Sequence, residues 1–177
     1  MLTKVVETTT AETTTVETTA STTNANYEYI ANVTVANINN TSASSTYTNY
    51  TTNSALQINL TKGNTYPISV KVGNPDVADY DAVAAFIDFN KDGIFSDSER
   101  VLNYPVTLTQ PSTVVSGNFA IPSNAVEGQP LRMRVVAFFV GAGTGNGNVG
   151  LSLPAEYVCD VNFQYGEIED YNVVITG

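Results

Sequence analysis

The sequence of 177 residues contains no histidine and no tryptophan, and it has a single cysteine, Cys159. The absence of histidine excludes catalytic triads and dyads that need an imidazole base, and it excludes zinc sites with histidine ligands. One cysteine cannot form an intrachain disulfide. We therefore expect a protein that is not an enzyme and whose fold is stabilised by an element other than an intrachain disulfide.

Basic residues are scarce, because seven Lys and Arg stand against 17 Asp and Glu and give a net charge of −10. Nucleic acids and anionic membrane surfaces bind clusters of positive charge, so neither is an expected partner. No apolar run is long enough for membrane insertion, and the start of the chain does not resemble a leader peptide. If the protein is secreted, we expect its leader to have been removed or to lie outside this sequence.

The most informative stretch is residues 88–99, which fits the calcium-loop spacing D-x-[DN]-x-[DN]-G-x5-E at every specified position. The candidate metal ligands are Asp88, Asn90, Asp92, the carbonyl of Ile94, and Glu99. Such a set of hard oxygens favours Ca²⁺ over zinc. The flanks are short apolar runs of strand formers, so we expect the loop to join strands. The alternative is an acidic surface turn without metal.

Residues 1–26 form a Thr-rich tail of low complexity, with a five-residue unit of one apolar residue, Glu and threonines. Its composition is typical of a solvated linker or an O-glycosylated stalk. Thr and Val also favour strands, and the tail has no Gly or Pro to interrupt one. The second possibility is therefore an assembly strand that adds to the sheet of a neighbouring subunit.

Residues 27–177 have an all-β pattern of short apolar segments separated by Gly, Pro and Asn. The expected strands are 27–35, 55–60, 66–72, 82–87, 101–105, 107–108, 117–121, 131–140 and 171–176, with short strands and turns in 37–53. This pattern predicts an antiparallel β-sandwich, jelly-roll-like, with no helix.

The first third of this domain carries five N-x-S/T sequons, which are possible glycosylation sites. They are Asn32, Asn39, Asn40, Asn49 and Asn59. An Asn/Thr-rich segment also produces sequons by chance. The glycine-rich stretch 141–150 lacks lysine and the Walker spacing, so we interpret it as a loop and not as a phosphate site.

Near the end of the chain, residues 166–171 read GEIEDY and place Glu167, Glu169 and Asp170 within four residues. Arg132 and Arg134 lie two apart on one expected strand, hence on one face, and are candidate ion-pair partners. Alternatively, the acids complete the metal shell. A glycosidase acid–base pair would need a carboxyl group in an apolar cleft, of which the sequence gives no sign.

These motifs resemble the GEVED domain family. GEIEDY resembles the signature GEVED with Ile in place of Val, residues 87–95 resemble its W-I-D-Y-N-x-D-G-x-F run, and residues 131–135 resemble its R-M-R-V strand. The resemblance covers residues 27–177 and departs from the pattern at Phe86, where Trp is usual. It implies a secreted or surface β-sandwich module of bacteria, often an accessory to peptidases and sorting domains, with no catalytic residues. No enzyme domain accompanies it in these 177 residues, so we expect the module and its tail to be the whole molecule.

Two functions follow as hypotheses. The first is a non-enzymatic extracellular structural protein, a calcium-stabilised sandwich that self-assembles into a surface fibre or matrix by strand addition of the tail. It would be a homo-oligomer or polymer. The second is a glycan- or cell-surface-binding accessory module, in which exposed tyrosines stack on sugar rings. The candidates for stacking are Tyr47, Tyr50, Tyr80 and Tyr165.

Overall fold

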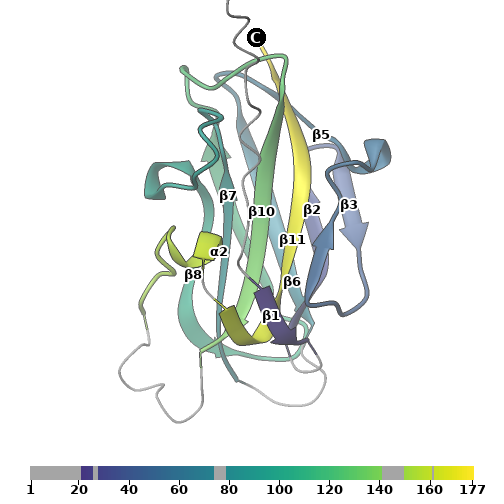
Figure 1. Cartoon of the computed structure of the whole chain (residues 1–177), viewed down its shortest axis with the longest axis vertical. Coiled ribbons are helices and arrows are strands. Elements are labelled where there is room, and N and C mark those ends of the chain that lie inside the picture. Colours follow the sequence, from purple (N-terminus) through teal and green to yellow (C-terminus); the bar gives the residue numbers. More distant parts are fainter. Residues whose placement is uncertain (1–20, 26–27, 74–78, 141–149, 161) are drawn as a thin grey trace, which may run out of the picture.

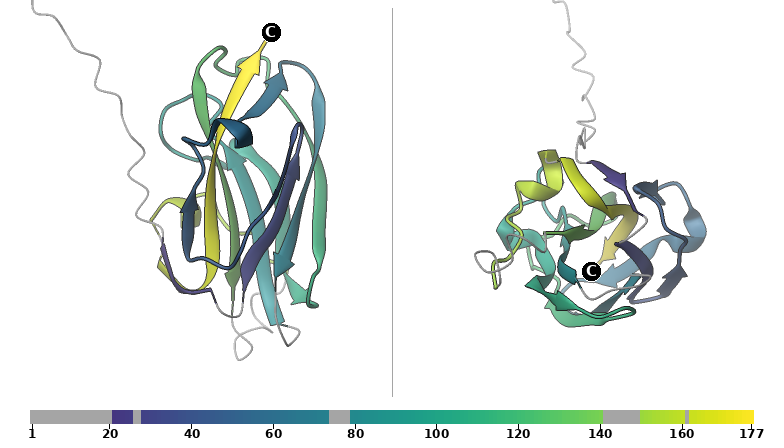
Figure 2. Two further views of the ribbon diagram at one scale, coloured as in Figure 1. Left: turned by 90° about the vertical axis from the view of Figure 1, so that its right-hand side faces the viewer. Right: turned by 90° about the horizontal axis from the view of Figure 1, so that it is seen from below.

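The protein is a sandwich of two β-sheets (Figures 1 and 2). A computed structural model describes residues 21–25, 28–73, 79–140, 150–160 and 162–177. The strands are β1 Ser21–Asn24, β2 Tyr29–Val35, β3 Ile38–Thr41, β4 Tyr47–Asn49, β5 Ile58–Thr61, β6 Thr65–Gly73, β7 Asp79–Ile87, β8 Arg100–Thr109, β9 Val114–Ala120, β10 Pro130–Phe139 and β11 Asn162–Thr176. The helical elements are η1 Ser54–Leu56, η2 Asp97–Glu99 and α2 Tyr157–Asp160.

The larger sheet has seven strands and is built around β11, its longest strand. One edge of β11 pairs antiparallel with β10, which continues to β7 and β8. The other edge is filled by three short strands in turn, β1, β4 and β5, and all three run parallel to β11. This edge of β11 is thus covered by segments from the first third of the chain.

The smaller sheet has four antiparallel strands in the order β3-β2-β6-β9. A register shift after Ile30 marks a bulge in β2. The bulge changes which residues face inward, so Ile30, Val33 and Val35 are all buried although the first two are three residues apart. Outside the bulge, successive side chains of a strand alternate between the face toward the other sheet and the outer face.

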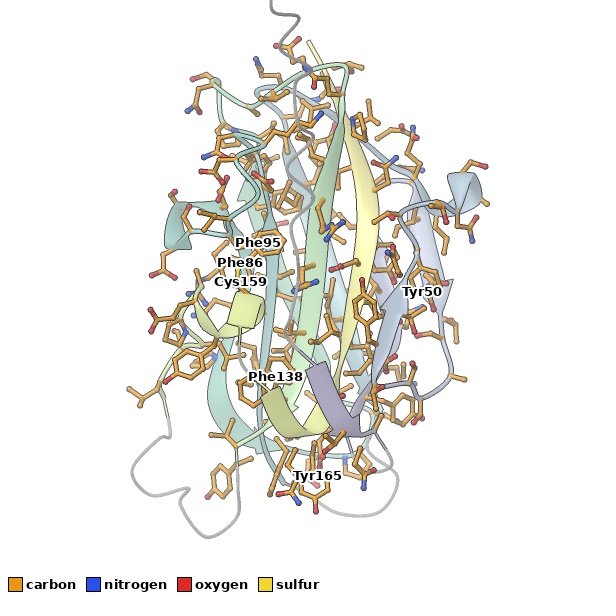
Figure 3. The ribbon with its side chains drawn as sticks, in the orientation of Figure 1. Tyr50, Phe86, Phe95, Phe138, Cys159 and Tyr165 are labelled. Carbon is orange, nitrogen blue, oxygen red and sulfur yellow. The ribbon has the colours of Figure 1, made fainter. Side chains whose placement is uncertain are left out.

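The main core lies between the two sheets and consists mostly of branched aliphatic side chains, together with a few alanines, Met133 and the aromatic residues Phe89, Phe119 and Tyr171. Fully burying one such aliphatic side chain stabilises the fold by about 1.5–3 kcal/mol. A second apolar cluster lies on the outer face of the seven-stranded sheet. There Phe86, Phe138 and Ile168 pack against Val158 of α2 and Phe95, and Figure 3 shows Phe86, Phe95 and Cys159 close together on this side.

The predicted all-β sandwich is confirmed, with corrections in detail. The expectation of no helix was wrong, because α2 packs on the outer face through Val158. Strands 101–105 and 107–108 are one strand, β8, and the last strand begins at Asn162 and contains GEIEDY within it. The pairs of β1, β4 and β5 with β11 are parallel. No helix in the described part of the chain is long and apolar enough to cross a membrane.

Candidate functional site

The acidic loop at residues 88–99 begins where β7 ends and closes with η2, just before β8. Asp88 still belongs to the sheet, because its backbone N–H donates to the Arg132 carbonyl at 3.0 Å. Two phenylalanines fix the loop on opposite faces of the sheet. Phe89 is buried in the core between the sheets, and Phe95 is buried in the outer cluster, with its ring centroid 5.9 Å from that of Phe86. The loop is therefore anchored to both apolar clusters.

Asp88 organises the turn of the loop. Its Oδ1 accepts the Asp92 N–H at 3.1 Å and its Oδ2 accepts the Gly93 N–H at 3.0 Å. Lys91 and Gly93 adopt φ of 58° and 85°, and the left-handed region suits Gly93 because glycine has no Cβ. The tight turn predicted from Gly93 is thus present.

Glu99 closes the loop from its far end although its side chain is 4 % exposed. Its Oε1 accepts the N–H groups of Phe89 at 3.0 Å and Asn90 at 3.4 Å. Its Oε2 accepts the N–H and hydroxyl of Ser96 at 3.0 and 2.9 Å. The distal glutamate therefore ties the first and last turns of the loop together.

The loop concentrates negative charge. Burial raises the pKa of Asp88, and the nearby charges of Glu99 and Asp92 raise it further, against the lowering effect of the loop amides. Lys91 of the loop donates to Gln129, and Arg100, just after the loop, pairs with Asp97, which is not one of the candidate ligands. Asp88, Asp92 and Glu99 have no Lys or Arg partner in the described part of the chain. A cation would relieve this repulsion.

The donor set consists of hard oxygens with no sulfur or imidazole, which fits calcium. In the described conformation the loop side chains bond to one another: Asn90 donates to Asp92 Oδ2 at 2.7 Å, and Asp92 Oδ1 accepts the Ile94 N–H at 2.8 Å. Among the described residues, no three Asp, Glu or Cys side chains converge on one point. If the loop bound calcium, Asn90 and Asp92 would have to give up their mutual hydrogen bond to reach the ion.

The GEIEDY motif lies in the middle of β11 and its side chains alternate between the two faces. Gly166 has φ of 135°, and a Cβ at this position would lie 2.3 Å from the Ala137 carbonyl oxygen. Glu167 and Glu169 point into the sandwich and are fully buried. The Ile30 N–H donates to Glu167 at 2.9 Å, and the Tyr171 hydroxyl donates to Glu169 at 2.7 Å.

Burial raises the pKa of Glu167 to about 8, and the charge of Glu169 adds to the effect. Burial likewise raises the pKa of Glu169, in spite of the hydrogen bond from Tyr171. One oxygen of each carboxyl group has no hydrogen-bond partner in the described structure. Burial therefore favours the protonated, neutral form of both carboxyl groups, and the effect is stronger at Glu167 than at Glu169.

Asp170 faces the opposite way, into the outer layer, and is neutralised by arginine. Arg134 makes a bidentate contact with it, with both N···O distances 2.7 Å, and also donates to the Val158 carbonyl at 2.7 Å. Arg132 lies 3.7 Å from the same carboxylate. The Tyr47 hydroxyl donates to it at 3.0 Å. Arg134 and Asp170 are both fully buried, so this group joins β10, β11 and α2.

The additional metal ligands suggested among Glu167, Glu169 and Asp170 are all engaged elsewhere. Two of them lie between the sheets and the third pairs with arginine. The whole of β10 separates β11 from β7, the strand that leads into the loop. None of the three acids completes the ligand set of the loop in this structure.

The tyrosines expected to stack on sugars have structural contacts. The Tyr50 ring tilts against Tyr171, with centroids 5.1 Å apart, and the Tyr165 ring meets Phe139 edge-on at 5.7 Å. Tyr80 packs on the outer apolar cluster. Figure 3 shows Tyr50 and Tyr165 in separate regions of the molecule. The four tyrosines do not form a common platform.

The sequons differ in the state of the asparagine side chain. The amide of Asn40 donates to the buried Tyr171 hydroxyl at 2.9 Å, so its nitrogen faces the interior. Asn32 donates to Asn39 at 2.7 Å on the outer face of the small sheet. Asn49 accepts from the N–H and hydroxyl of Thr51, and Asn59 is exposed. Glycosylation at Asn32, Asn39, Asn40, Asn49 and Asn59 stays a prediction.

Sequence reasoning missed the roles of Phe89 and Phe95 as anchors of the loop. Both lie within the run IDFNKDGIF. Phe89 directly follows the first candidate ligand, and Phe95 lies two positions after the glycine, so the sequence does show both aromatic residues. Their burial on opposite faces of one sheet depends on the path of the loop, which spacing alone does not specify.

Fold and site together define a β-sandwich module with an acidic interstrand loop and a closing strand rich in buried acids. The profile of the GEVED domain matches residues 82–174, from β7 to the end part of β11. This match covers more than half of the chain, and the chain belongs to the GEVED domain family. No curated protein matches it.

Proposed function

We propose that this protein is a non-enzymatic extracellular structural protein, a calcium-stabilised sandwich that self-assembles into a surface fibre or matrix through its N-terminal tail. The observation that carries the proposal is the position of β1. The chain passes directly from residues 1–20, which lie outside the described residues, into a strand of the large sheet.

β1 is held as an edge strand. It pairs with residues 162–165 of β11, and within the described chain it has no strand on its other side. The Thr22 hydroxyl, buried beside this edge, bonds to the carbonyls of Gly166 at 2.7 Å and Thr46 at 3.0 Å. Figure 1 shows β1 beside the start of β11, at the end of the sandwich opposite the C-terminus. An open edge strand is a template for pairing with another chain.

A structural role also fits the acids. Glu167, whose pKa burial raises to about 8, is sealed between the sheets at 0 % exposure, where a substrate does not reach it. The acids of the loop form an oxygen set that suits a stapling calcium ion. Membership of a family of secreted modules supports an extracellular setting.

The test compares the full chain with two truncations by electron microscopy and by light scattering on a sizing column. Removing residues 1–20 keeps β1, whereas removing residues 1–25 takes β1 as well. We expect filaments or large particles from the full chain and folded monomers from both truncations. A full chain that stays monomeric contradicts self-assembly.

The matched control keeps the length and charge of the tail but replaces alternate threonines by proline, which removes backbone donors and cannot form a ladder. We expect this variant to remain monomeric. Filaments from the proline variant, or from the chain that begins at residue 21, would show that assembly does not use strand addition of the tail.

A further inference from the structure

The outer faces of the two sheets differ. Segments between residues 150 and 160 cover the large sheet, whereas no described element packs on the outer face of the small sheet. Many of the outward side chains there are short and polar: Asn32 and Thr34 of β2, Asn39 and Thr41 of β3, and Ser69 of β6. Amide and hydroxyl groups thus line an open surface.

This surface is hollowed into a groove of about 570 Å³. Its lining includes Tyr29, Asn32, Asn39, Thr41, Ser69 and Lys71. Asn32 donates to Asn39 at 2.7 Å and to Thr41 at 3.0 Å, which fixes the orientation of the amide. The groove therefore presents ordered hydrogen-bonding groups to solvent.

An aromatic ring forms one end of the groove. Tyr29 and Gly73 are paired across β2 and β6. A Cβ on Gly73 would lie 2.2 Å from the tip of the Tyr29 ring, so the ring lies flat over the glycine backbone. Such a half-buried ring on a glycine floor is a platform on which a sugar ring can stack.

Lys71 supplies a positive charge for which the described residues offer no ion-pair partner. Every other described lysine and arginine is engaged: Lys62 with Glu127, Lys91 with Gln129, Arg100 with Asp97, and Arg132 and Arg134 with Asp170. Of these basic side chains, that of Lys71 alone has no ion pair or hydrogen bond among the described residues. In a chain with net charge −10, a lysine left unpaired in a groove is a candidate to bind an anion.

We propose that this groove binds an acidic glycan, with a sugar ring on Tyr29, a uronate carboxylate on Lys71, and hydroxyls on the Asn32–Asn39 amides. The platform, the amides and the cation lie on neighbouring strands of one rigid sheet, so they are already in place before binding. The site is separate from the tyrosines considered above and does not depend on assembly through the tail.

The test uses the full chain, produced in a host without N-glycosylation because Asn32 and Asn39 are sequons. Binding of hyaluronate hexasaccharide, which alternates a uronate with an amide-bearing sugar, is followed by calorimetry and NMR at constant salt and calcium. The same oligosaccharide with its carboxylates reduced to alcohols is the neutral comparison. We expect the reduced oligosaccharide to bind about tenfold more weakly, a difference of about 1.4 kcal/mol.

The variants are Lys71→Gln and Tyr29→Ala, each expected to weaken binding about tenfold. The matched control, Lys91→Gln, makes the same charge change in the acidic loop and should leave binding unchanged. Lys71→Gln is a surface change that preserves folding, so it tests the site even if Tyr29→Ala is unstable.

Three results would overturn the proposal. The first is equal binding of the acidic and the reduced oligosaccharide, and the second is no binding of either at millimolar concentration. The third is self-association that Lys71→Gln abolishes without any glycan binding, which would make the face a contact between copies of the chain.

Discussion

Two groups of acidic side chains lie on opposite flanks of β10 and are held in contrasting ways. In the loop after β7, Asp88, Asp92 and Glu99 are satisfied by backbone amides and have no basic partner in the described chain. On β11, Asp170 is neutralised by two arginines, and Glu167 and Glu169 are buried with raised pKa values.

The difference shows that local sequence density of acids does not identify a metal site. The β11 acids are closer together in the sequence, yet strand alternation sends them to two faces, where burial favours the neutral form of the two glutamates and arginine pairs with Asp170. The loop acids are spread over twelve residues, but the turn gathers their charge without neutralising it. The first group is buried within the fold, whereas the second has no basic partner in the described chain, which is why we propose it as the cation site.

The largest expected effect is that of Arg134→Ala. This change leaves the buried charge of Asp170 and the Val158 carbonyl without their donor, and breaking a buried ion pair costs about 3–5 kcal/mol. Arg132→Ala is the matched control, since its side chain is 24 % exposed and lies 3.7 Å away, and it should cost less than about 1 kcal/mol. Denaturant unfolding measures both. Equal costs for the two variants would contradict the assignment of the buried pair.

The glycines of the two regions give a second comparison. Gly166→Ala puts a Cβ 2.3 Å from the Ala137 carbonyl at φ of 135°, and strain plus overpacking should cost about 2–4 kcal/mol. Gly93→Ala should destabilise the protein by about 1–2 kcal/mol, mainly because alanine is strained at φ of 85°. Unfolding with and without calcium separates them, because only Gly93→Ala should weaken the calcium response. If Gly166→Ala weakened the stabilisation by calcium and Gly93→Ala did not, the assignment of the calcium site to the loop would be contradicted.

The pH dependence of stability tests the neutral core acids. The pKa of Glu167 is about 8 in the folded protein against an ordinary 4.5, so between these values the folded state holds the extra proton. The stabilisation is complete below about pH 4.5 and is lost as pH rises through about 8. The free energy of unfolding should fall by up to about 1.4 kcal/mol per pH unit for this proton.

Glu167→Gln retains an acceptor for the Ile30 N–H and removes the titration. Denaturant unfolding at several pH values between about 5 and 8 should give a shallower slope for this variant than for the wild type. The exposed Glu156→Gln serves as the control and should keep the wild-type slope. Stability that rises toward pH 8 in the wild type would show that Glu167 is ionised in the fold.

The β-sandwich, the family and the turn at Gly93 could be predicted from the sequence, because alternation of apolar and polar residues, turn residues and fixed motif spacing are local signals. It did not predict the parallel pairs of β1, β4 and β5 with β11, since pairing between distant segments depends on the whole topology. Nor did it predict that Glu167 and Asp170 belong to different layers. That outcome follows from GEIEDY being inside a strand rather than before one.

The pairing of Arg134 with Asp170 shows the same limit. The two-residue spacing of Arg132 and Arg134 placed both on one face, but it did not distinguish the fully buried arginine from the partly exposed one. The difference comes from α2, whose Val158 carbonyl accepts from Arg134. A four-residue helix has too short a pattern to be recognised by periodicity.

The most direct test of the loop as a metal site is thermal unfolding with millimolar calcium and then with excess chelator, for the wild type, Asp92→Asn and Asp97→Asn. Extracellular calcium modules bind at about 10⁻⁴ to 10⁻³ M, so saturation should stabilise the wild type by about 1–3 kcal/mol. Asp92→Asn should lose most of this response. Asp97→Asn, an equal charge change in the same loop outside the ligand set, should keep it. A wild-type midpoint that does not move with calcium would contradict the metal site and make residues 88–99 an acidic turn.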